Sequence, residues 1–283
     1  MMQVAAIHDI SCFGRCSLTV ALPILSAAGI NCAVIPTAVL STHTGGLDGF
    51  TYKDLTEEIL PIADHWKTLG LSFDALYSGF LGSFDQVDIL KKLFKSFHTP
   101  NCLVLVDPVM GDEGQLYKTF SADFPGKMLE LVREADLVTP NVTEAALLTN
   151  QVYREGPHQR EYIENLIKKL ADTIGTGKRI VLTGVSFNET ELGAAVYEGS
   201  GVSYVFGRGY PGQYPGTGDV YSSVLLAKLL NGFSLTESAK AAADFVSEGI
   251  KRTIDAGTDP RFGIFFEALL REGFTPLGNG PLG

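Results

Sequence analysis

Basic residues are scarce in this 283-residue sequence, and they do not cluster. Lys and Arg number 22 against 32 Asp and Glu, so the formal net charge is −10 with His neutral. No run of Lys and Arg forms the basic stripe that binding to a nucleic-acid backbone requires. We therefore predict no nucleic-acid partner, and we expect any bound phosphate to be held by local groups.

The sequence also lacks a long apolar run, and its first residues do not predict a secretory leader. The most apolar stretch, residues 18–40, is interrupted by Pro23, Asn31 and Pro36 and does not supply the roughly 18 apolar residues of a membrane span. The first residues, MMQ, carry no basic region before an apolar segment. We expect no membrane partner and a cytoplasmic location.

Cysteine is rare, and its spacing fits neither a disulfide framework nor a metal site. Of the four cysteines, only Cys12 and Cys16 lie close together in the sequence, and no second pair accompanies them. This pattern favours free thiols. The sequence is richer in apolar residues, at 45% hydrophobic with a mean hydropathy of +0.15, which is enough for a full core.

Short apolar runs alternate with amphipathic segments, an order that predicts β-α-β units. The runs typical of buried parallel strands cover residues 4–7, 32–39, 74–78, 103–107, 137–139 and 179–183. Amphipathic helices are expected over residues 17–28, 53–69, 86–97, 122–134, 143–149 and 159–174, and further helices over residues 219–231, 235–253 and 262–271. Residues 192–197 and 202–206 flank a glycine turn and predict an antiparallel hairpin. The whole pattern predicts a three-layer α/β/α sandwich with a central, mostly parallel sheet and an antiparallel edge, in a single domain over residues 1–283.

Two glycines and a threonine open a strongly helical segment in the C-terminal third, in the sequence Pro215-Gly216-Thr217-Gly218-Asp219. Backbone N–H groups at a helix start are unpaired, and the helix dipole favours negative charge there. The segment therefore predicts an anion hole. Asp219 beside that hole is either a catalytic carboxylate or a plain N-cap, and the pattern alone leaves both open.

Acidic groups also follow two of the predicted strands. Asp107 and Asp112 belong to the segment DPVMGD, and Asn141 and Glu144 belong to TPNVTE at residues 139–144. Ligands of open α/β sheets bind at the carboxyl ends of the strands. Oxygen ligands of this kind suit Mg²⁺, which joins one or two carboxylates to substrate phosphates. We predict a phosphate and magnesium site at this edge, against the alternative that each segment is a turn with a helix cap.

These motifs, in this order, resemble the ribokinase-like superfamily and, within it, the pyridoxal/pyridoxamine (vitamin B6) kinases. The resemblance covers nearly the whole chain and rests on the segments STHTG (41–45), SGFLGS (78–83), DPVMGD (107–112), TPNVTE (139–144) and GTGD (216–219). The GTGD segment is shared across the superfamily, whereas HTG and DPVMGD are more particular to the B6 kinases. The family implies transfer of the ATP γ-phosphoryl group to the 5′ hydroxymethyl group of pyridoxal, pyridoxamine or pyridoxine. It also implies Mg²⁺, a monovalent cation as a further candidate, and a homodimer.

The resemblance assigns a role to each motif. Asp219 would be the base that faces the substrate hydroxyl, and the Gly216, Thr217 and Gly218 amides would stabilise the transferring phosphoryl group. Phosphoryl transfer needs such positioning and charge stabilisation more than covalent chemistry. The metal ligands would be Asp107 and Glu144. The nucleotide with its metal would lie among Asp107, Asp112, Thr139, Asn141, Glu144, Thr183 and Thr217.

The acceptor ring would be framed by Thr44, Phe80 and Asp9, and here the sequence departs from the family. Relatives often show Ser at the position of Asp9. A carboxylate there can pair with a protonated ring nitrogen or with the amine of pyridoxamine, so we expect the enzyme to tolerate or prefer the amine form. Gly184 stands where some relatives carry a phosphate-facing Lys, so the positive charge would come from metal ions or from Arg208. Residues 206–215, the expected flap over ATP, follow no relative closely.

Three alternatives remain open at this point. One keeps the fold and the chemistry but takes hydroxymethylpyrimidine or another small alcohol, such as a sugar or a nucleoside, as the acceptor. Another is a nucleotide-dependent dehydratase acting on hydrated nicotinamide nucleotides, which reuses the same loop. The third is a nucleotide-binding module without turnover. The Asn141–Glu144 pair and the acidic segment at residues 107–112 favour the kinases, and the intact Asp219 argues against a module that only binds.

Overall fold

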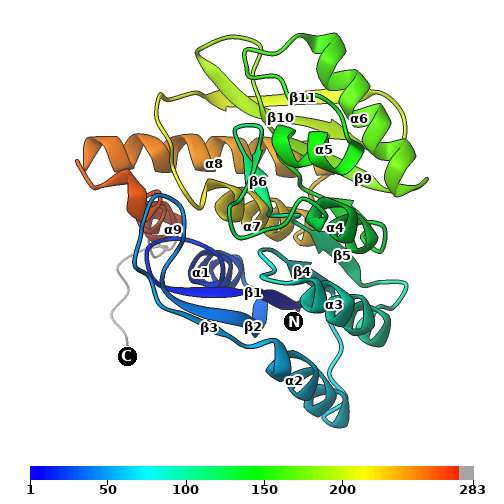
Figure 1. Cartoon of the computed structure of the whole chain (residues 1–283). Helices are drawn as coiled ribbons and strands as arrows, with labels where there is room; N and C mark the ends of the chain where they lie inside the picture. Colours follow the sequence, from blue (N-terminus) through cyan, green and yellow to red (C-terminus); the bar gives the residue numbers. More distant parts are fainter. Residues whose placement is uncertain (274–283) are drawn as a thin grey trace.

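The computed structural model describes residues 1–273, in which nine strands form one twisted sheet between two layers of helices (Figure 1). The strand order across the sheet is β11-β10-β9-β8-β5-β4-β1-β2-β3. The bounds are β1 Gln3–Phe13, β2 Asn31–Thr42, β3 Tyr52–Asp54, β4 Ala75–Ser78, β5 Leu103–Val106, β8 Leu137–Val138, β9 Arg179–Val185, β10 Glu191–Tyr197 and β11 Val202–Arg208.

The centre of the sheet is parallel and both of its edges are antiparallel. The neighbours from β2 through β1, β4, β5 and β8 to β9 pair in parallel. The β10–β11 hairpin extends one edge, and β3 pairs antiparallel to β2 at the other. The predicted fold class and the hairpin edge are therefore confirmed.

Two apolar cores cover the opposite faces of the sheet. Successive side chains of a strand point to opposite faces, so Ala5 and Ile7 enter one core and Val4 enters the other. The first core is covered by α2 (Thr56–Thr68), α3 (Phe84–Phe97), α4 (Phe124–Val132), α5 (Val142–Thr149) and α6 (Arg160–Ile174). The second is covered by α1 (Leu18–Ala27), α7 (Thr217–Leu230) and α8 (Leu235–Asp255). This division gives the three layers that the alternation predicts.

Two sequence predictions about helices are wrong at their boundaries. The helix expected from residue 53 begins only at Thr56, because Tyr52 and Lys53 pair with Leu40 and Val39 as the edge strand β3. The helix expected over residues 262–271 is two elements, the 3₁₀ turn η1 (Pro260–Phe262) and α9 (Glu267–Gly273). Gly263, at φ 86°, ends the turn and prevents one continuous helix.

Other expectations concern the termini and the cysteines. The single domain predicted over residues 1–283 includes residues 274–283, which lie outside the described residues. No helix within residues 1–273 has both the length and the apolar character needed to cross a membrane. The four cysteines are free thiols, as the spacing predicted.

Candidate active site

Asp219 lies in the first turn of α7, behind a loop that only glycine can close. Gly216 is the N-cap residue at φ 80°, and a Cβ there would collide with the backbone carbonyl of Arg15. In the part of the chain described, no side chain caps this helix start, and the N–H groups of Gly218 and Asp219 have no hydrogen-bond partner. These donors leave an anion-binding position at the end of the helix.

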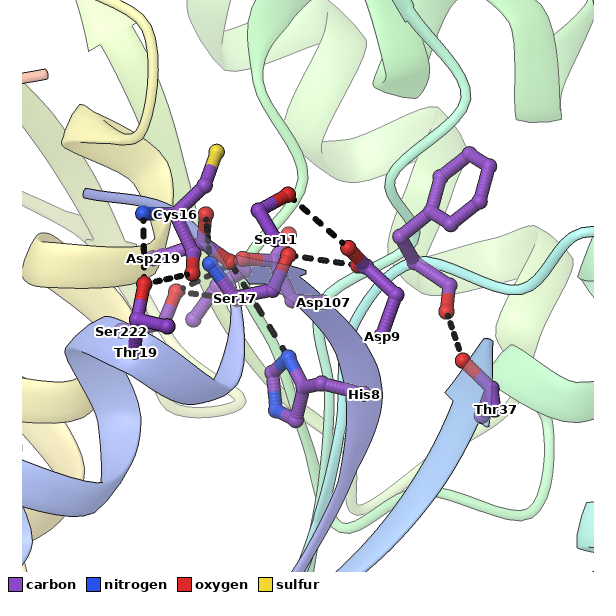
Figure 2. Close-up of polar contacts among 12 residues, drawn as sticks. His8, Asp9, Ser11, Cys16, Ser17, Thr19, Thr37, Asp107, Asp219 and Ser222 are labelled. Atoms are coloured by element: carbon purple, nitrogen blue, oxygen red, sulfur yellow. Dashed lines mark hydrogen bonds and ion pairs between the residues drawn. The ribbon is translucent and has the colours of Figure 1, made fainter. Parts of the chain in front are cut away.

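The Asp219 carboxyl group is held by the N-terminal strand and the loop that follows it (Figure 2). Its Oδ2 accepts a 2.9 Å hydrogen bond from the Ser17 N–H, and its Oδ1 lies 4.0 Å from Nδ1 of His8. Its side chain is 12% exposed. Burial raises the pKa of Asp219 to about 6; the Ser17 N–H acts in the opposite direction, and the charge of Asp9 adds to the rise. A carboxylate with this pKa is suited to accept a proton near neutral pH.

His8 is a buried neutral neighbour of this carboxylate. It is fully buried on β1, and its ring meets Tyr77 edge-on with 4.3 Å between the ring centroids. Burial lowers the pKa of His8 to about 3, so the imidazole carries no charge at neutral pH. Neither ring nitrogen has a hydrogen-bond partner within residues 1–273. His8 therefore shields Asp219 from water without adding a positive charge.

Asp9 occupies an irregular position in β1. The register with β2 shifts between His8 and Ile10, as at a β-bulge, and such irregularities redirect side chains. Asp9 is 4% exposed, and its carboxyl group accepts hydrogen bonds from the Ser17 hydroxyl at 2.6 Å and the Ser11 hydroxyl at 3.3 Å. Burial raises the pKa of Asp9, and both hydroxyl groups act against that rise.

A second polar cluster lies at the carboxyl ends of β5 and β8. Ser222, one turn beyond Asp219 on α7, lies 3.0 Å from Oδ2 of Asp107 and 3.0 Å from the hydroxyl of Thr139. All three side chains are buried. Burial raises the pKa of Asp107 to about 8, and the charge of Asp219 contributes to the rise. Helix α7 thus carries Asp219 and, through Ser222, contacts Asp107.

Asn141 and Glu144 form a capping box at the start of α5. The Asn141 side chain accepts from the Glu144 N–H at 2.8 Å, and Glu144 accepts from the Asn141 N–H at 2.8 Å and the Met110 N–H at 3.1 Å. The amide of Asn141 also donates to the Gly111 carbonyl at 2.9 Å. The helix cap that the sequence pattern allows as the alternative to a metal site is therefore present at Asn141 and Glu144. Glu144 is nevertheless 3% exposed, and burial together with the charge of Asp107 raises its pKa.

The buried carboxyl groups of Asp107 and Glu144 fit a divalent cation. One oxygen of Asp107, Oδ1, accepts no hydrogen bond from the described residues, and the pKa of each group is raised partly by other carboxylates. A cation between them would relieve that repulsion. Residues 1–273 contain no group of three or more His, Cys, Asp or Glu that could hold a metal. Mg²⁺ usually binds proteins through one or two carboxylates together with substrate phosphates and waters.

The remaining predicted site residues are Thr183 in β9, Asp112 in β6, and Thr44 and Phe80 in the segments that follow β2 and β4. Thr183 pairs with Asn141 across a parallel bridge. Thr44 is exposed between β2 and β3, Phe80 is half-buried just after β4, and Asp112 is exposed in the short hairpin of β6 (Gly111–Asp112) and β7 (Gln115–Leu116). Within residues 1–273, no hydrogen bond joins Thr44, Phe80 or Asp112 to the buried carboxyl groups.

Sequence reasoning missed three residues that the structure places against the carboxyl groups, namely His8, Ser17 and Ser222. Ser17 is separated from Asp219 by 202 positions, and Ser222 from Asp107 by 115. Only the folded sheet creates these contacts. Ser222 alone could have been found from the local sequence, because a residue three positions after Asp219 lies on the same face of a helix.

Comparison with known proteins agrees with this geometry. The family model for phosphomethylpyrimidine kinase matches residues 22–261. A crystal structure, with pyridoxal, of a Bacteroides thetaiotaomicron protein assigned as a phosphomethylpyrimidine kinase shares 37% identity at a TM-score of 0.89, covering 98% of this chain and 96% of that one. Pyridoxal kinase from Lactobacillus plantarum shares 33% identity at a TM-score of 0.88, with 97% of each chain covered.

A curated pyridoxal kinase from Actinobacillus pleuropneumoniae is 28% identical over 243 residues, which are 81% of each protein. The resemblance to the vitamin B6 kinases of the ribokinase-like superfamily is thus confirmed. The chain belongs to the phosphomethylpyrimidine kinase family, whose model spans most of its length.

Proposed function

We propose that this protein is a pyridoxal kinase that transfers the γ-phosphoryl group of ATP to the 5′ hydroxymethyl group of pyridoxal, pyridoxamine or pyridoxine. The observation that carries the proposal is the buried Asp219 carboxylate beside two unpaired backbone N–H groups at the start of α7. The similarity to a structure that contains pyridoxal, at 37% identity over almost the whole chain, supports the vitamer as acceptor.

Asp219 carries out the proton transfer in this proposal. Its carboxylate takes the proton of the 5′ hydroxyl as that oxygen forms a bond to the γ-phosphorus, and the bond between the γ-phosphorus and the β–γ bridging oxygen breaks to release ADP. Within the Gly216, Thr217 and Gly218 segment, the Thr217 N–H donates to the Tyr214 carbonyl at 3.4 Å, so the free donors are the N–H groups of Gly218 and Asp219. These two groups would stabilise the charge that develops on the phosphoryl oxygens. Because burial raises the pKa of Asp219 to about 6, the group is both ionised at a pH of about 7.5 and basic enough to accept a proton.

The nucleotide would lie along the carboxyl ends of β5, β8 and β9. Asp107 and Glu144 would hold Mg²⁺, and Asp112, Thr139, Asn141 and Thr183 surround the same edge. When bound, Mg²⁺ supplies positive charge that neutralises the phosphates. Gly184 has a φ of 75° with open space beside it, so the chain supplies no cation at that position. Arg208, exposed at the end of β11, is the basic side chain that we propose for an additional charge.

Hydroxymethylpyrimidine is a second candidate acceptor, because the matching family model is that of phosphomethylpyrimidine kinase. The curated relatives are named as pyridoxal kinases, which favours the vitamers over the pyrimidine and over the dehydratase considered from the sequence. Incubation with MgATP and each vitamer or the pyrimidine, with ADP and product measured by mass spectrometry, tests the proposal. Turnover of the pyrimidine alone would reject it.

The homodimer, a monovalent cation and the cytoplasmic location complete the proposal. Light scattering during size-exclusion chromatography gives the assembly mass, and activity in sodium, potassium and tetramethylammonium salts reports any cation requirement. A monomer at assay concentration would remove the homodimer from the account.

A further inference from the structure

Ser17 connects the carboxyl groups of Asp219 and Asp9, which the proposed function places at the phosphoryl acceptor. Its backbone N–H donates to Oδ2 of Asp219 at 2.9 Å, and its hydroxyl donates to Oδ1 of Asp9 at 2.6 Å. The residue is 5% exposed, and Figure 2 shows it between the two carboxylates. One residue therefore fixes a group assigned to proton transfer and a group assigned to the acceptor ring.

The hydroxyl of Ser17 does not do what its position in the chain would suggest. Ser17 is the N-cap residue of α1, where a serine hydroxyl normally accepts from the first helical N–H groups. Here the side chain makes no capping hydrogen bond and is turned to Asp9 instead. An ordinary structural role as a helix cap thus does not account for the hydroxyl.

The backbone of Ser17 is also unusual. Its φ is 54° with ψ −128°, a conformation that residues with a side chain rarely adopt. Neighbouring segments hold it there, because the Arg15 N–H donates to the Phe262 carbonyl at 2.9 Å and Gly216 packs on the Arg15 carbonyl. Strained residues of this kind occur where a site requires a particular geometry. A glycine would adopt the same backbone more easily but would supply no hydroxyl.

Asp9 has hydroxyl donors but no lysine or arginine partner in the described chain. Neither Lys nor Arg forms an ion pair with it within residues 1–273, and its two side-chain donors are Ser11 and Ser17. His43 lowers the pKa of Asp9, but it too forms no ion pair with Asp9 within these residues. A buried carboxylate without a permanent counter-charge is costly unless a ligand supplies one. The amine of pyridoxamine, a cation at neutral pH, is such a ligand.

We propose that Ser17 is a positioning residue that orients the Asp9 carboxylate to select acceptors bearing a cationic amine. The inference rests on the proposed function and adds to it a structural reason for a preference for pyridoxamine among the vitamers. Ser17 acts through Asp9 in this role, and its N–H separately holds Asp219.

The test uses Ser17→Ala and Ser17→Gly, which both remove the hydroxyl and keep the N–H. Ser238→Ala is the matched control, because Ser238 is fully buried on α8 with an unpartnered hydroxyl. We expect kcat/KM for pyridoxamine, relative to pyridoxine, to fall about tenfold in both Ser17 variants through a higher KM, since a hydrogen bond to a charged group is lost. The control keeps the wild-type ratio. Ser17→Gly also relieves the backbone strain, so it reports on the hydroxyl even if the alanine variant folds poorly.

Asp9→Asn completes the experiment as a double-mutant cycle. If Ser17 acts through Asp9, Ser17→Gly changes the vitamer ratio in the wild type but leaves it unchanged in the Asp9→Asn background. Equal losses for both vitamers, or the same change in both backgrounds, would overturn the inference. A wild-type enzyme that phosphorylates no vitamer would instead reject the proposed function, so the two failures are distinguishable.

Discussion

Asn in place of Asp219 is expected to stabilise the protein while it removes the carboxylate that we propose as the catalytic base. The folded protein holds this carboxyl at a pKa of about 6, against an ordinary value of 3.8, mainly because the group is buried. A difference of about 2 units corresponds to roughly 3 kcal/mol at about 1.36 kcal/mol per unit. The Asn side chain keeps an oxygen that can accept from the Ser17 N–H, so this hydrogen bond need not be lost.

The pH at which this gain appears follows from the sign of the shift. A raised carboxyl pKa means that the folded state binds the proton more tightly than the unfolded state. The folded state is therefore penalised increasingly as pH rises from about 4 to about 6, and the penalty is complete above that range. The Asp219→Asn variant carries no such penalty. For a chain of this length, roughly 3 kcal/mol corresponds to a rise in Tm of about 5 °C.

Calorimetry of the wild type and Asp219→Asn between about pH 4 and about pH 8 measures the effect. Asp172→Asn, an exposed aspartate on α6, is the matched control for the change of side chain. The difference in Tm should be largest above a pH of about 6 and small near pH 4. A variant no more stable than the wild type at neutral pH, or a difference that does not depend on pH, would refute the reasoning about burial.

The remaining predictions concern activity at other positions of the site. Asp9→Asn should lower the ratio of kcat/KM for pyridoxamine over pyridoxal about tenfold, because the carboxylate charge is lost, as measured by initial rates of ADP release. Asp107→Asn should raise the Mg²⁺ concentration for half-maximal rate roughly tenfold or more, as measured by titration at fixed ATP. Gly216→Ala should abolish turnover and lower Tm by more than Gly29→Ala, since both glycines have φ near 80° but only Gly216 packs on the Arg15 carbonyl.

Each of these predictions has a clear contrary result. An unchanged vitamer ratio in Asp9→Asn would show that the carboxylate does not contact the substituent. An unchanged Mg²⁺ titration in Asp107→Asn would remove Asp107 from the metal site. Equal losses of Tm in Gly216→Ala and Gly29→Ala would show that the positive φ alone, and not the close approach to Arg15, explains why glycine is required at position 216.

The layers of the fold follow from local pattern. Continuous apolar runs indicate strands buried on both faces, and β4 and β5 lie within one or two residues of the predicted ranges. Strand β3 has only three residues, all exposed, so it offers no periodicity to detect, and its pairing with β2 decides its conformation. The break before α9 depends on Gly263 and on the buried Phe266, which anchors the chain between the two elements.

The site was predictable where a motif carries its own geometry. A glycine-rich helix start places Asp219 beside unpaired N–H groups whatever the rest of the chain does. The contacts that tune the group come from elsewhere, because Ser17 and His8 lie about 200 positions away in the sequence. The capping box of Asn141 and Glu144 shows where a local motif is not enough, because the same sequence pattern fits both a helix cap and a metal site.

A competition experiment tests the central claim most directly. Equimolar pyridoxal, pyridoxamine, pyridoxine and hydroxymethylpyrimidine are incubated in one vessel with limiting MgATP, and each phosphorylated product is measured by mass spectrometry. The product ratios give the relative kcat/KM values without any effect of enzyme concentration. The account predicts that the phosphorylated vitamers, pyridoxamine phosphate prominent among them, account for nearly all the ATP consumed. A product dominated by hydroxymethylpyrimidine phosphate, or consumption of ATP without phosphorylation of any vitamer, would contradict it.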